Sequence, residues 1–195
     1  MLNTIADARK QVEKMPVIAL AGNPNAGKTA LFNAITGARQ HVGNWPGVTV
    51  EKKEGFVSMD GGQALIIDLP GIYAFSSRAI DETIARDFII DERPDVVINV
   101  VDSTNLERNL YLTLQLLEMG VPVIVALNMF DEAEALKLDI NVEKLSKLLG
   151  VEVVPTVAVD GEGVDELLEA AFRAAFHTRL GGSSPAGHGG TLSFR

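Results

Sequence analysis

The sequence contains no cysteine, and this absence excludes disulfide bonds, thiolate metal sites and cysteine nucleophiles. No uninterrupted apolar stretch approaches the roughly 20 residues that a membrane-spanning helix needs. Basic residues are also in the minority. The 17 Lys and Arg against 26 Asp and Glu give a formal net charge of −9, which argues against a general nucleic-acid binder. An acidic domain can still hold a phosphate group locally.

The length of 195 residues and the hydrophobic share of 47% are typical of one well-packed globular domain with a small appendage. Residues 1–14 mix charged and apolar side chains, which predicts a short amphipathic helix and not a signal peptide. We expect the domain itself at residues 15–177. Residues 178–195 are rich in Gly and Ser without periodicity, which is typical of a flexible tail or linker.

Residues 22–29, Gly-Asn-Pro-Asn-Ala-Gly-Lys-Thr, match the phosphate-binding pattern G-x-x-x-x-G-K-[ST]. An apolar, strand-like run precedes the pattern and a helix-like run follows it, as a P-loop requires. The glycines let backbone N–H groups converge on phosphate oxygens, Lys28 brings a positive charge to the β- and γ-phosphates, and the hydroxyl of Thr29 can ligate Mg²⁺. The alternative for this segment alone is an ordinary turn between a strand and a helix.

Strand-like and helix-like segments alternate along the chain. Strands are expected at 16–21, 49–58, 64–67, 96–101, 121–127 and 151–154. Helices are expected at 28–37, 80–90, 105–119, 142–149 and 164–177. A polar loop is expected at residues 39–47. A hairpin-like turn is expected at 60–62, between two antiparallel strands. This order predicts an α/β three-layer sandwich with a mostly parallel six-stranded sheet and one antiparallel strand, whose ligands bind at the carboxyl ends of the strands.

A carboxylate follows one of these strands in the sequence Asp68-Leu69-Pro70-Gly71. At a strand end facing the P-loop, Asp68 suits a Mg²⁺ site, usually through a bound water, because Mg²⁺ keeps much of its hydration shell. Gly71 would let a backbone N–H approach the γ-phosphate closely. The alternative is that these four residues simply form a turn.

The sequence Asn128-Met129-Phe130-Asp131 follows the next apolar strand but one and has N-x-x-D spacing. A carboxylate at Asp131 can accept from both N1–H and the exocyclic amino group of guanine. Adenine would leave this carboxylate unpaired, since its N1 is an acceptor, and such sites can discriminate by about 10⁴ or more. The alternative is a helix cap.

These motifs, in this order, resemble the five G-motifs of a small GTPase domain: residues 22–29, Thr49, 68–71, 128–131 and 156–159. With residues 42–51, Val-Gly-Asn-Trp-Pro-Gly-Val-Thr-Val-Glu, the chain resembles the N-terminal cytosolic G domain of the ferrous iron transport protein B family over about residues 15–176. The resemblance implies a Ras-like P-loop GTPase fold and Mg²⁺-dependent hydrolysis of GTP to GDP. It also implies a place beside the membrane domain of the same transporter, on the cytoplasmic side of the prokaryotic inner membrane, and leaves self-association open.

The resemblance also assigns roles to single residues. Mg²⁺ would be held by Thr29, Thr49 and Asp68. Potassium, which activates members of this family, would be held by the Asn25 side chain and carbonyls before Thr49, here Gly43 and Trp45. The catalytic residues would be Asn25, Lys28, Thr49 and Gly71. The residues expected to bind GTP or GDP are Gly22, Asn23, Pro24, Asn25, Ala26, Gly27, Lys28, Thr29, Ala30, Gly47, Val48, Thr49, Asp68, Leu69, Pro70, Gly71, Asn128, Met129, Asp131, Val157, Ala158 and Val159.

One departure from the Ras pattern concerns the mechanism. Ile72 stands where Ras has the glutamine that orients the attacking water, and isoleucine can neither donate nor accept a hydrogen bond. Our hypothesis is slow hydrolysis stimulated by K⁺ over Na⁺, with the stimulation lost in Asn25→Ala. The alternative for Asn25 is a hydrogen bond within its own loop.

Other interpretations stay open. An assembly or RNA-associated GTPase would share the fold, although the acidic balance weakens it, and an ATP-dependent kinase would share the P-loop, although N-x-x-D opposes it. Trp45 is either a mobile loop aromatic or a packing residue, and Arg39 either an arginine finger or a solvated charge. The histidines, His41, His177 and His188, are too dispersed to predict an iron site.

Overall fold

A computed structural model describes residues 15–59, 62–76 and 79–179 of the chain. The predicted helix at 1–14 and residues 180–195 of the predicted tail lie outside the described residues, as do residues 60 and 61 of the predicted turn. Within the described ranges, no helix is both long enough and apolar enough to span a membrane.

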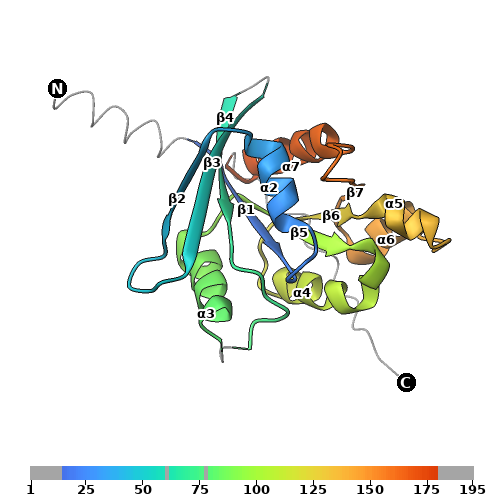
Figure 1. Cartoon of the computed structure of the whole chain (residues 1–195), viewed down its shortest axis with the longest axis horizontal. Coiled ribbons are helices and arrows are strands. Elements are labelled where there is room, and N and C mark those ends of the chain that lie inside the picture. The colour runs from blue at the N-terminus through green and yellow to red at the C-terminus, as the bar shows by residue number, and fades with distance from the viewer. Residues whose placement is uncertain (1–14, 60–61, 77–78, 180–195) are drawn as a thin grey trace.

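One sheet forms the middle layer (Figure 1). Its seven strands are β1 (Val17–Gly22), β2 (Gln40–Asn44), β3 (Glu51–Met59), β4 (Gly62–Asp68), β5 (Val96–Asp102), β6 (Val123–Asn128) and β7 (Val153–Pro155). They lie in the order β2-β3-β4-β1-β5-β6-β7, and β3 alone runs against the others. The central strands β5 and β6 are almost wholly buried, which explains why their sequences are apolar without alternation.

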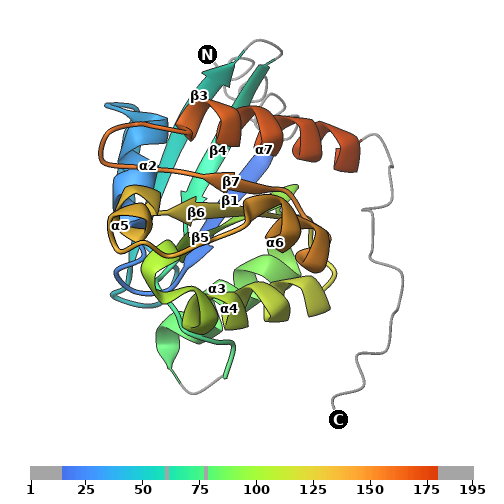
Figure 2. The ribbon, with the colours of Figure 1, turned by 90° about the vertical axis from the view of Figure 1, so that its right-hand side faces the viewer.

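Helices cover both faces of the sheet (Figure 2). The longer helices are α2 (Lys28–Thr36), α3 (Ile80–Asp87), α4 (Leu106–Glu118), α6 (Val142–Leu149) and α7 (Val164–Arg179). Shorter elements are the π-helix η1 (Phe88–Glu92), the 3₁₀-helix η2 (Ser103–Asn105) and α5 (Phe130–Ala135). Apolar side chains of α2 and α7 pack on one face of the sheet, and those of α3, α4 and α6 pack on the other. The three-layer α/β arrangement is therefore confirmed.

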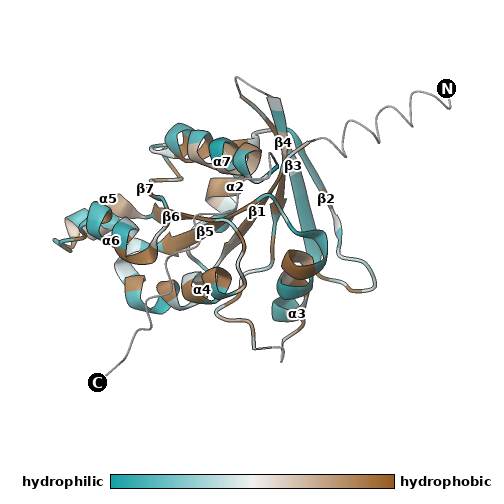
Figure 3. Cartoon of the chain, turned by 180° about the vertical axis from the view of Figure 1, so that it is seen from behind, coloured by the Kyte–Doolittle hydropathy of each residue, from teal (hydrophilic) through white to brown (hydrophobic). Residues whose placement is uncertain are grey.

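Hydropathy follows these layers. Figure 3 shows hydrophobic residues along the central strands, and hydrophilic residues on much of the outer helices and of β2 and β3. The α2 side chains Leu31, Phe32 and Ile35 lie against the sheet, and Gly37 caps the end of this helix. Burying the apolar stripe of each helix against the sheet supplies the main favourable term in folding this domain.

The strand count corrects the prediction, because residues 39–47 contain β2 and the sheet has seven strands instead of six. All five residues of β2 are exposed, so this edge strand is held by pairing with β3 and not by burial. A strand with no buried face has no alternating apolar pattern, and periodicity could not reveal it. The single helix expected at 80–90 is in fact two elements. The α-helix α3 ends at Asp87, and the π-helix η1 follows it directly.

The two ends of the domain are joined through Asp95. Its Oδ2 accepts a hydrogen bond from the Val17 N–H at 2.8 Å, and its Oδ1 accepts from Arg179 Nε at 2.8 Å. A second guanidinium nitrogen of Arg179 donates to the Met15 carbonyl at 2.5 Å. Thr178 and Arg179, predicted in the tail, are therefore the last residues of α7, and this anchor extends the domain to residue 179.

Candidate nucleotide-binding site

The loop between β1 and α2 turns sharply over Asn23 to Ala26. The Ala26 N–H donates to the Asn23 carbonyl at 3.2 Å, with proline in the second position of the turn and Asn25 at a φ of 68° in the third. Proline at the second position and a positive φ at the third are the features of a type II turn, and Asn tolerates this conformation better than most residues. The turn leads directly into the first turn of α2.

The N-terminus of α2 is open to an anion. Among the described residues no side chain caps it, and its first turn contains no acidic residue. Free backbone N–H groups and the helix dipole both favour a phosphate at such an end. Gly27 has a φ of 84°, and a Cβ there would lie 2.1 Å from Asn128 Nδ2, so glycine is required twice over. The geometry fits the phosphate-binding role predicted for residues 22–29.

Asn128 joins three segments at the end of β6. Its Nδ2 donates to the Ala26 carbonyl at 2.9 Å, and its Oδ1 accepts from the Ala158 N–H at 3.0 Å and from Thr156 Oγ1 at 3.3 Å. Its own carbonyl accepts from Ser103 Oγ at 2.5 Å. Asn128 is only 3% exposed, so its amide holds these segments together from inside the protein, at the edge of the sheet where the parallel strands end. The phosphate loop and the predicted guanine-binding segments are therefore held together by one side chain.

Asp68 ends β4 beside the P-loop and forms an ion pair with Lys28. The segment that follows stays against this loop, because the Ile72 N–H donates to the Gly22 carbonyl at 3.1 Å. Gly71 lies so close to Pro24 that a Cβ would be 3.4 Å from its backbone. The structure thus brings together the residues predicted for phosphate and Mg²⁺ on β1, α2 and β4, with a cationic and an anionic group already in contact.

The predicted guanine-binding residues lie at the same edge of the sheet. Met129 adopts a φ of 57°, which starts α5, and its methyl group lies 3.6 Å from the position of a Cβ on Gly27. Asp131 is exposed in the first turn of α5. Ala158 is buried, whereas Val159 is 80% exposed. An apolar side chain next to the P-loop, followed two residues later by an exposed carboxylate, supplies groups that can recognise the face and the edge of a purine.

The segment before β3 lies elsewhere. Figure 1 shows the connection between β2 and β3, which contains residues 45–50, apart from the loop that enters α2. Trp45 is 7% exposed and packs edge-on against Phe88, with ring centroids 5.5 Å apart. Its carbonyl accepts from the Val48 N–H at 3.2 Å. In this conformation Trp45 is a packing residue. Gly43 lies in the edge strand β2, and Gly47, Val48 and Thr49 lie with Trp45 on the connection between β2 and β3, apart from the P-loop.

One cluster of polar side chains was not predicted from the sequence. Asp102, at the end of β5, accepts hydrogen bonds from the Thr104 N–H at 2.8 Å, from Thr104 Oγ1 at 2.7 Å and from Asn105 Nδ2 at 2.8 Å. Burial alone would raise the pKa of Asp102, but the hydrogen bonds from Thr104 and Asn105 together hold it below the usual value. A run of turn and cap residues, Asp-Ser-Thr-Asn, directly after an apolar strand was the available signal.

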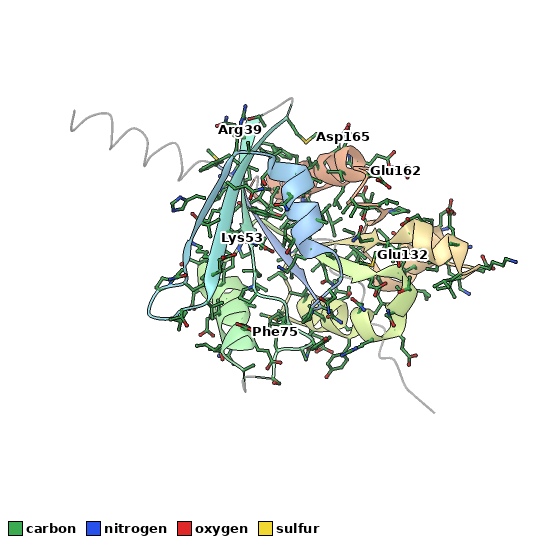
Figure 4. All side chains as sticks on the ribbon, viewed as in Figure 1. Arg39, Lys53, Phe75, Glu132, Glu162 and Asp165 are labelled. Atoms are coloured by element: carbon green, nitrogen blue, oxygen red, sulfur yellow. The ribbon has the colours of Figure 1, made fainter. Side chains whose placement is uncertain are left out.

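Other candidates lie away from the site. Figure 4 shows Arg39 at the end of the molecule opposite the start of α2, where its guanidinium lies 3.5 Å from Ser58 Oγ, so it is not an arginine finger in this conformation. Within the described residues no three His, Asp or Glu side chains gather to hold a metal ion. A cavity of about 860 Å³ lies between α6, α7 and the start of β6, and no predicted site residue lines it.

A P-loop at the end of β1, a carboxylate at the end of β4 and an N-x-x-D segment after β6 define this protein as a P-loop nucleotide-binding domain with the Ras-like fold. The family model of ferrous iron transport protein B matches residues 16–171. The chain therefore belongs to the FeoB family.

Individual relatives agree with this assignment. The chain is 54% identical to the Fe(2+) transporter FeoB of Salmonella typhimurium over 164 residues, which is 82% of this chain and 21% of that protein. It is similar to the FeoB G-domain from Methanococcus jannaschii, with 49% identity, a TM-score of 0.75, and coverage of 83% of this chain and 98% of that one.

A third relative carries information on the ligand. The cytosolic domain of the T. maritima FeoB iron transporter in its GDP form II has 50% identity and a TM-score of 0.81, with coverage of 83% of this chain and 63% of that one. The chain spans about a fifth of the length of the curated transporters that it matches.

Proposed function

We propose that this domain binds GTP and GDP, hydrolyses GTP and regulates a ferrous iron transporter. The observation that carries the proposal is the position of Asn128, whose amide contacts both the phosphate loop at Ala26 and the guanine segment at Ala158. A site of this kind needs phosphate and base recognition at one fixed separation, and a single buried side chain maintains it. The T. maritima relative with 50% identity is described in a GDP form, which supports the choice of guanine.

Asp131 selects the base in this proposal. Asp131 is exposed at the start of α5, two residues after Met129, which can pack on the purine face. Guanine presents two N–H donors to a carboxylate, whereas adenine presents an acceptor. A competition experiment tests this choice directly, and stronger binding of ATP than of GTP would contradict it.

Mg²⁺ fits the charges near the phosphate end. Lys28 and Asp68 form an ion pair that spans the loop. A triphosphate would draw Lys28 towards its β- and γ-oxygens, which would release the Asp68 carboxylate to support a metal ion through water. Thr29, in the first turn of α2, and Thr49 would supply hydroxyl ligands. Because Thr49 now lies on the β2–β3 connection, this arrangement requires residues 43–49 to move towards the P-loop.

Hydrolysis must proceed without a glutamine next to Gly71. Ile72 is 2% exposed and packs in the core with Leu69, so its side chain takes no part in orienting a water. An arginine finger accelerates Ras-type turnover by about 10⁵, roughly 7 kcal/mol. A K⁺ ion held by Asn25 beside the phosphates would neutralise part of the same developing charge. Asn25 is exposed at its positive φ, with its side chain available at the mouth of the loop.

The experiment compares GTP hydrolysis by this chain in equal concentrations of K⁺ and Na⁺. We expect faster turnover in K⁺, loss of that stimulation in Asn25→Ala, and largely retained GDP binding. Asn33→Ala is the matched control, because Asn33 is an exposed asparagine one and a half turns into α2 and outside the loop. Equal rates in K⁺ and Na⁺ would contradict the role of potassium.

We further infer that the partner that responds to the nucleotide is the membrane portion of the same transporter, and that the domain works on the cytoplasmic side of the inner membrane. The curated relatives are transporters almost five times the length that this chain covers. Fusing the domain to the remainder of such a transporter and measuring Fe²⁺ uptake with and without Asp131→Ala tests the coupling. Uptake that does not respond to this substitution would contradict it.

A further inference from the structure

Asn23 is the most unusual residue of the P-loop. This residue is 3% exposed, and among the residues that the structure describes neither its Oδ1 nor its Nδ2 has a hydrogen-bond partner. Its backbone is ordinary, since its carbonyl accepts from the Ala26 N–H. Buried amides are normally paired, and an unpaired one in a native structure calls for an explanation.

The side chain lies beneath the loop and not at its open surface. Each of its polar atoms exposes less than 1 Å², so it cannot reach a nucleotide bound outside the loop. In β1, Ala19 and Ala21 pack into the core cluster that contains Leu69 and Ile72. Asn23 comes two residues after Ala21, at the start of the turn that follows β1, where its amide is buried. Its amide therefore faces protein.

The segment after β4 runs directly past this position. The Gly22 carbonyl, one residue before Asn23, accepts from the Ile72 N–H at 3.1 Å. Pro24, one residue after Asn23, lies beside Gly71, because a Cβ on Gly71 would be 3.4 Å from the Pro24 backbone. Residues on both sides of Asn23 thus touch the segment whose Gly71 N–H is expected to meet the γ-phosphate.

We propose that Asn23 is a positioning residue that gains its hydrogen-bond partner in the GTP-bound state, from the main chain of residues 71–73. When Gly71 closes on the terminal phosphate, the Asn23 amide pairs with this main chain and holds the closed segment. With GDP there is no terminal phosphate to draw the segment in, and the amide stays unpaired. The inference rests on the proposed function, because it assigns Asn23 the task of distinguishing GTP from GDP.

This role explains why a costly residue is kept inside the loop. In the nucleotide-free domain the unpaired amide destabilises the fold, since a buried polar group without a partner keeps its full desolvation cost. An apolar side chain of similar shape should therefore stabilise the free domain and impair the response to GTP. A residue that merely fills space would not show these opposite effects.

The test uses Asn23→Leu, which keeps the branched shape, and Asn23→Ala, which cannot clash. For each variant the affinities for GDP and for a non-hydrolysable GTP analogue are measured with Mg²⁺, together with the melting temperature of the nucleotide-free protein. We expect the ratio of GTP-analogue to GDP affinity to fall about tenfold, which is the effect of one buried hydrogen bond. We expect Asn23→Leu to melt at least about 2 °C higher than the wild type.

Asn99→Leu is the matched control. Asn99 is also a buried amide whose Oδ1 has no partner among the described residues, but it lies in the middle of β5 and bonds Thr113 through Nδ2 at 2.7 Å. Its substitution should leave the nucleotide ratio unchanged. An unchanged ratio in Asn23→Ala overturns the proposal, and so does failure of both Asn23 variants to fold, since the amide would then be needed without GTP. If the wild type binds neither nucleotide, the proposed function fails instead.

Discussion

Replacing Asn128 by alanine removes three hydrogen bonds that connect segments far apart in the sequence. The Ala26 carbonyl and the Ala158 N–H lose their side-chain partner, and Thr156 Oγ1 loses a weaker contact at 3.3 Å. Ala26 is 1% exposed and Ala158 is 5% exposed, so water cannot readily replace the missing amide. We therefore expect Asn128→Ala to lower the stability of the domain even when no nucleotide is present.

The size of the effect follows from the two main-chain groups. A buried donor or acceptor without a partner costs about 1–3 kcal/mol, so the pair should cost about 3 kcal/mol. For a domain of this size that corresponds to a fall in melting temperature of roughly 6–12 °C. Since domains are typically stable by only about 5–15 kcal/mol, the loss would be a large fraction of the total.

Urea unfolding of the nucleotide-free protein, followed by far-UV circular dichroism, measures this cost without any contribution from guanine. Asn141→Ala is the matched control, because Asn141 Oδ1 accepts one exposed hydrogen bond, from the Lys144 N–H at 2.8 Å, as the cap of α6. Loss of such a cap should cost about 1 kcal/mol. If Asn128→Ala is no more destabilising than Asn141→Ala, Asn128 does not hold the two loops together as argued.

Three further predictions concern single residues. Gly27→Ala should unfold more readily and bind nucleotide poorly, because its Cβ would lie 2.1 Å from Asn128 Nδ2 and its φ is 84°; calorimetry and GDP titration check this. The hydrogen bonds that lower the Asp102 pKa favour its ionised form in the folded state, so the stability that they contribute is present above about pH 4 and lost as the pH falls further. The stability gap between wild type and Asp102→Asn should therefore narrow in acid. Trp45 is the chain's one tryptophan, and its fluorescence should shift when a GTP analogue with Mg²⁺ draws Thr49 towards the P-loop.

Each of these predictions has an outcome that contradicts it. A Gly27→Ala variant with wild-type GDP affinity would show that the loop can relax around the new methyl group. If the difference in stability between wild type and Asp102→Asn widens as the pH falls, the pKa of Asp102 is not lowered in the folded protein. Fluorescence that responds to GDP and to the GTP analogue alike would mean that Trp45 does not report on Thr49.

Much of the candidate site is local in sequence, and the sequence by itself determined that part. Gly27 and Lys28 lie within one contiguous motif, and Asp68 and Asn128 each stand at the end of an apolar strand. Parallel strands end at the same edge of a sheet, so these residues could be expected to meet there. The resemblance to the FeoB family, carried by the same motifs, is confirmed over residues 16–171. The metal ligands and the roles of single residues stay predictions.

Only the tertiary structure decided the features that depend on contacts between distant segments. Strand β2 has no buried face, so its existence depends on pairing with β3 and left no apolar pattern. The hydrogen bond from Asn128 to Ala26 joins residues 102 positions apart in the sequence. It forms because β1 and β6 both pair with β5, so that their ends lie at the same edge of the sheet. The sequence shows an asparagine at position 23 but not whether its amide has a hydrogen-bond partner. Its burial is fixed by the segment packed around it, which periodicity and spacing do not encode.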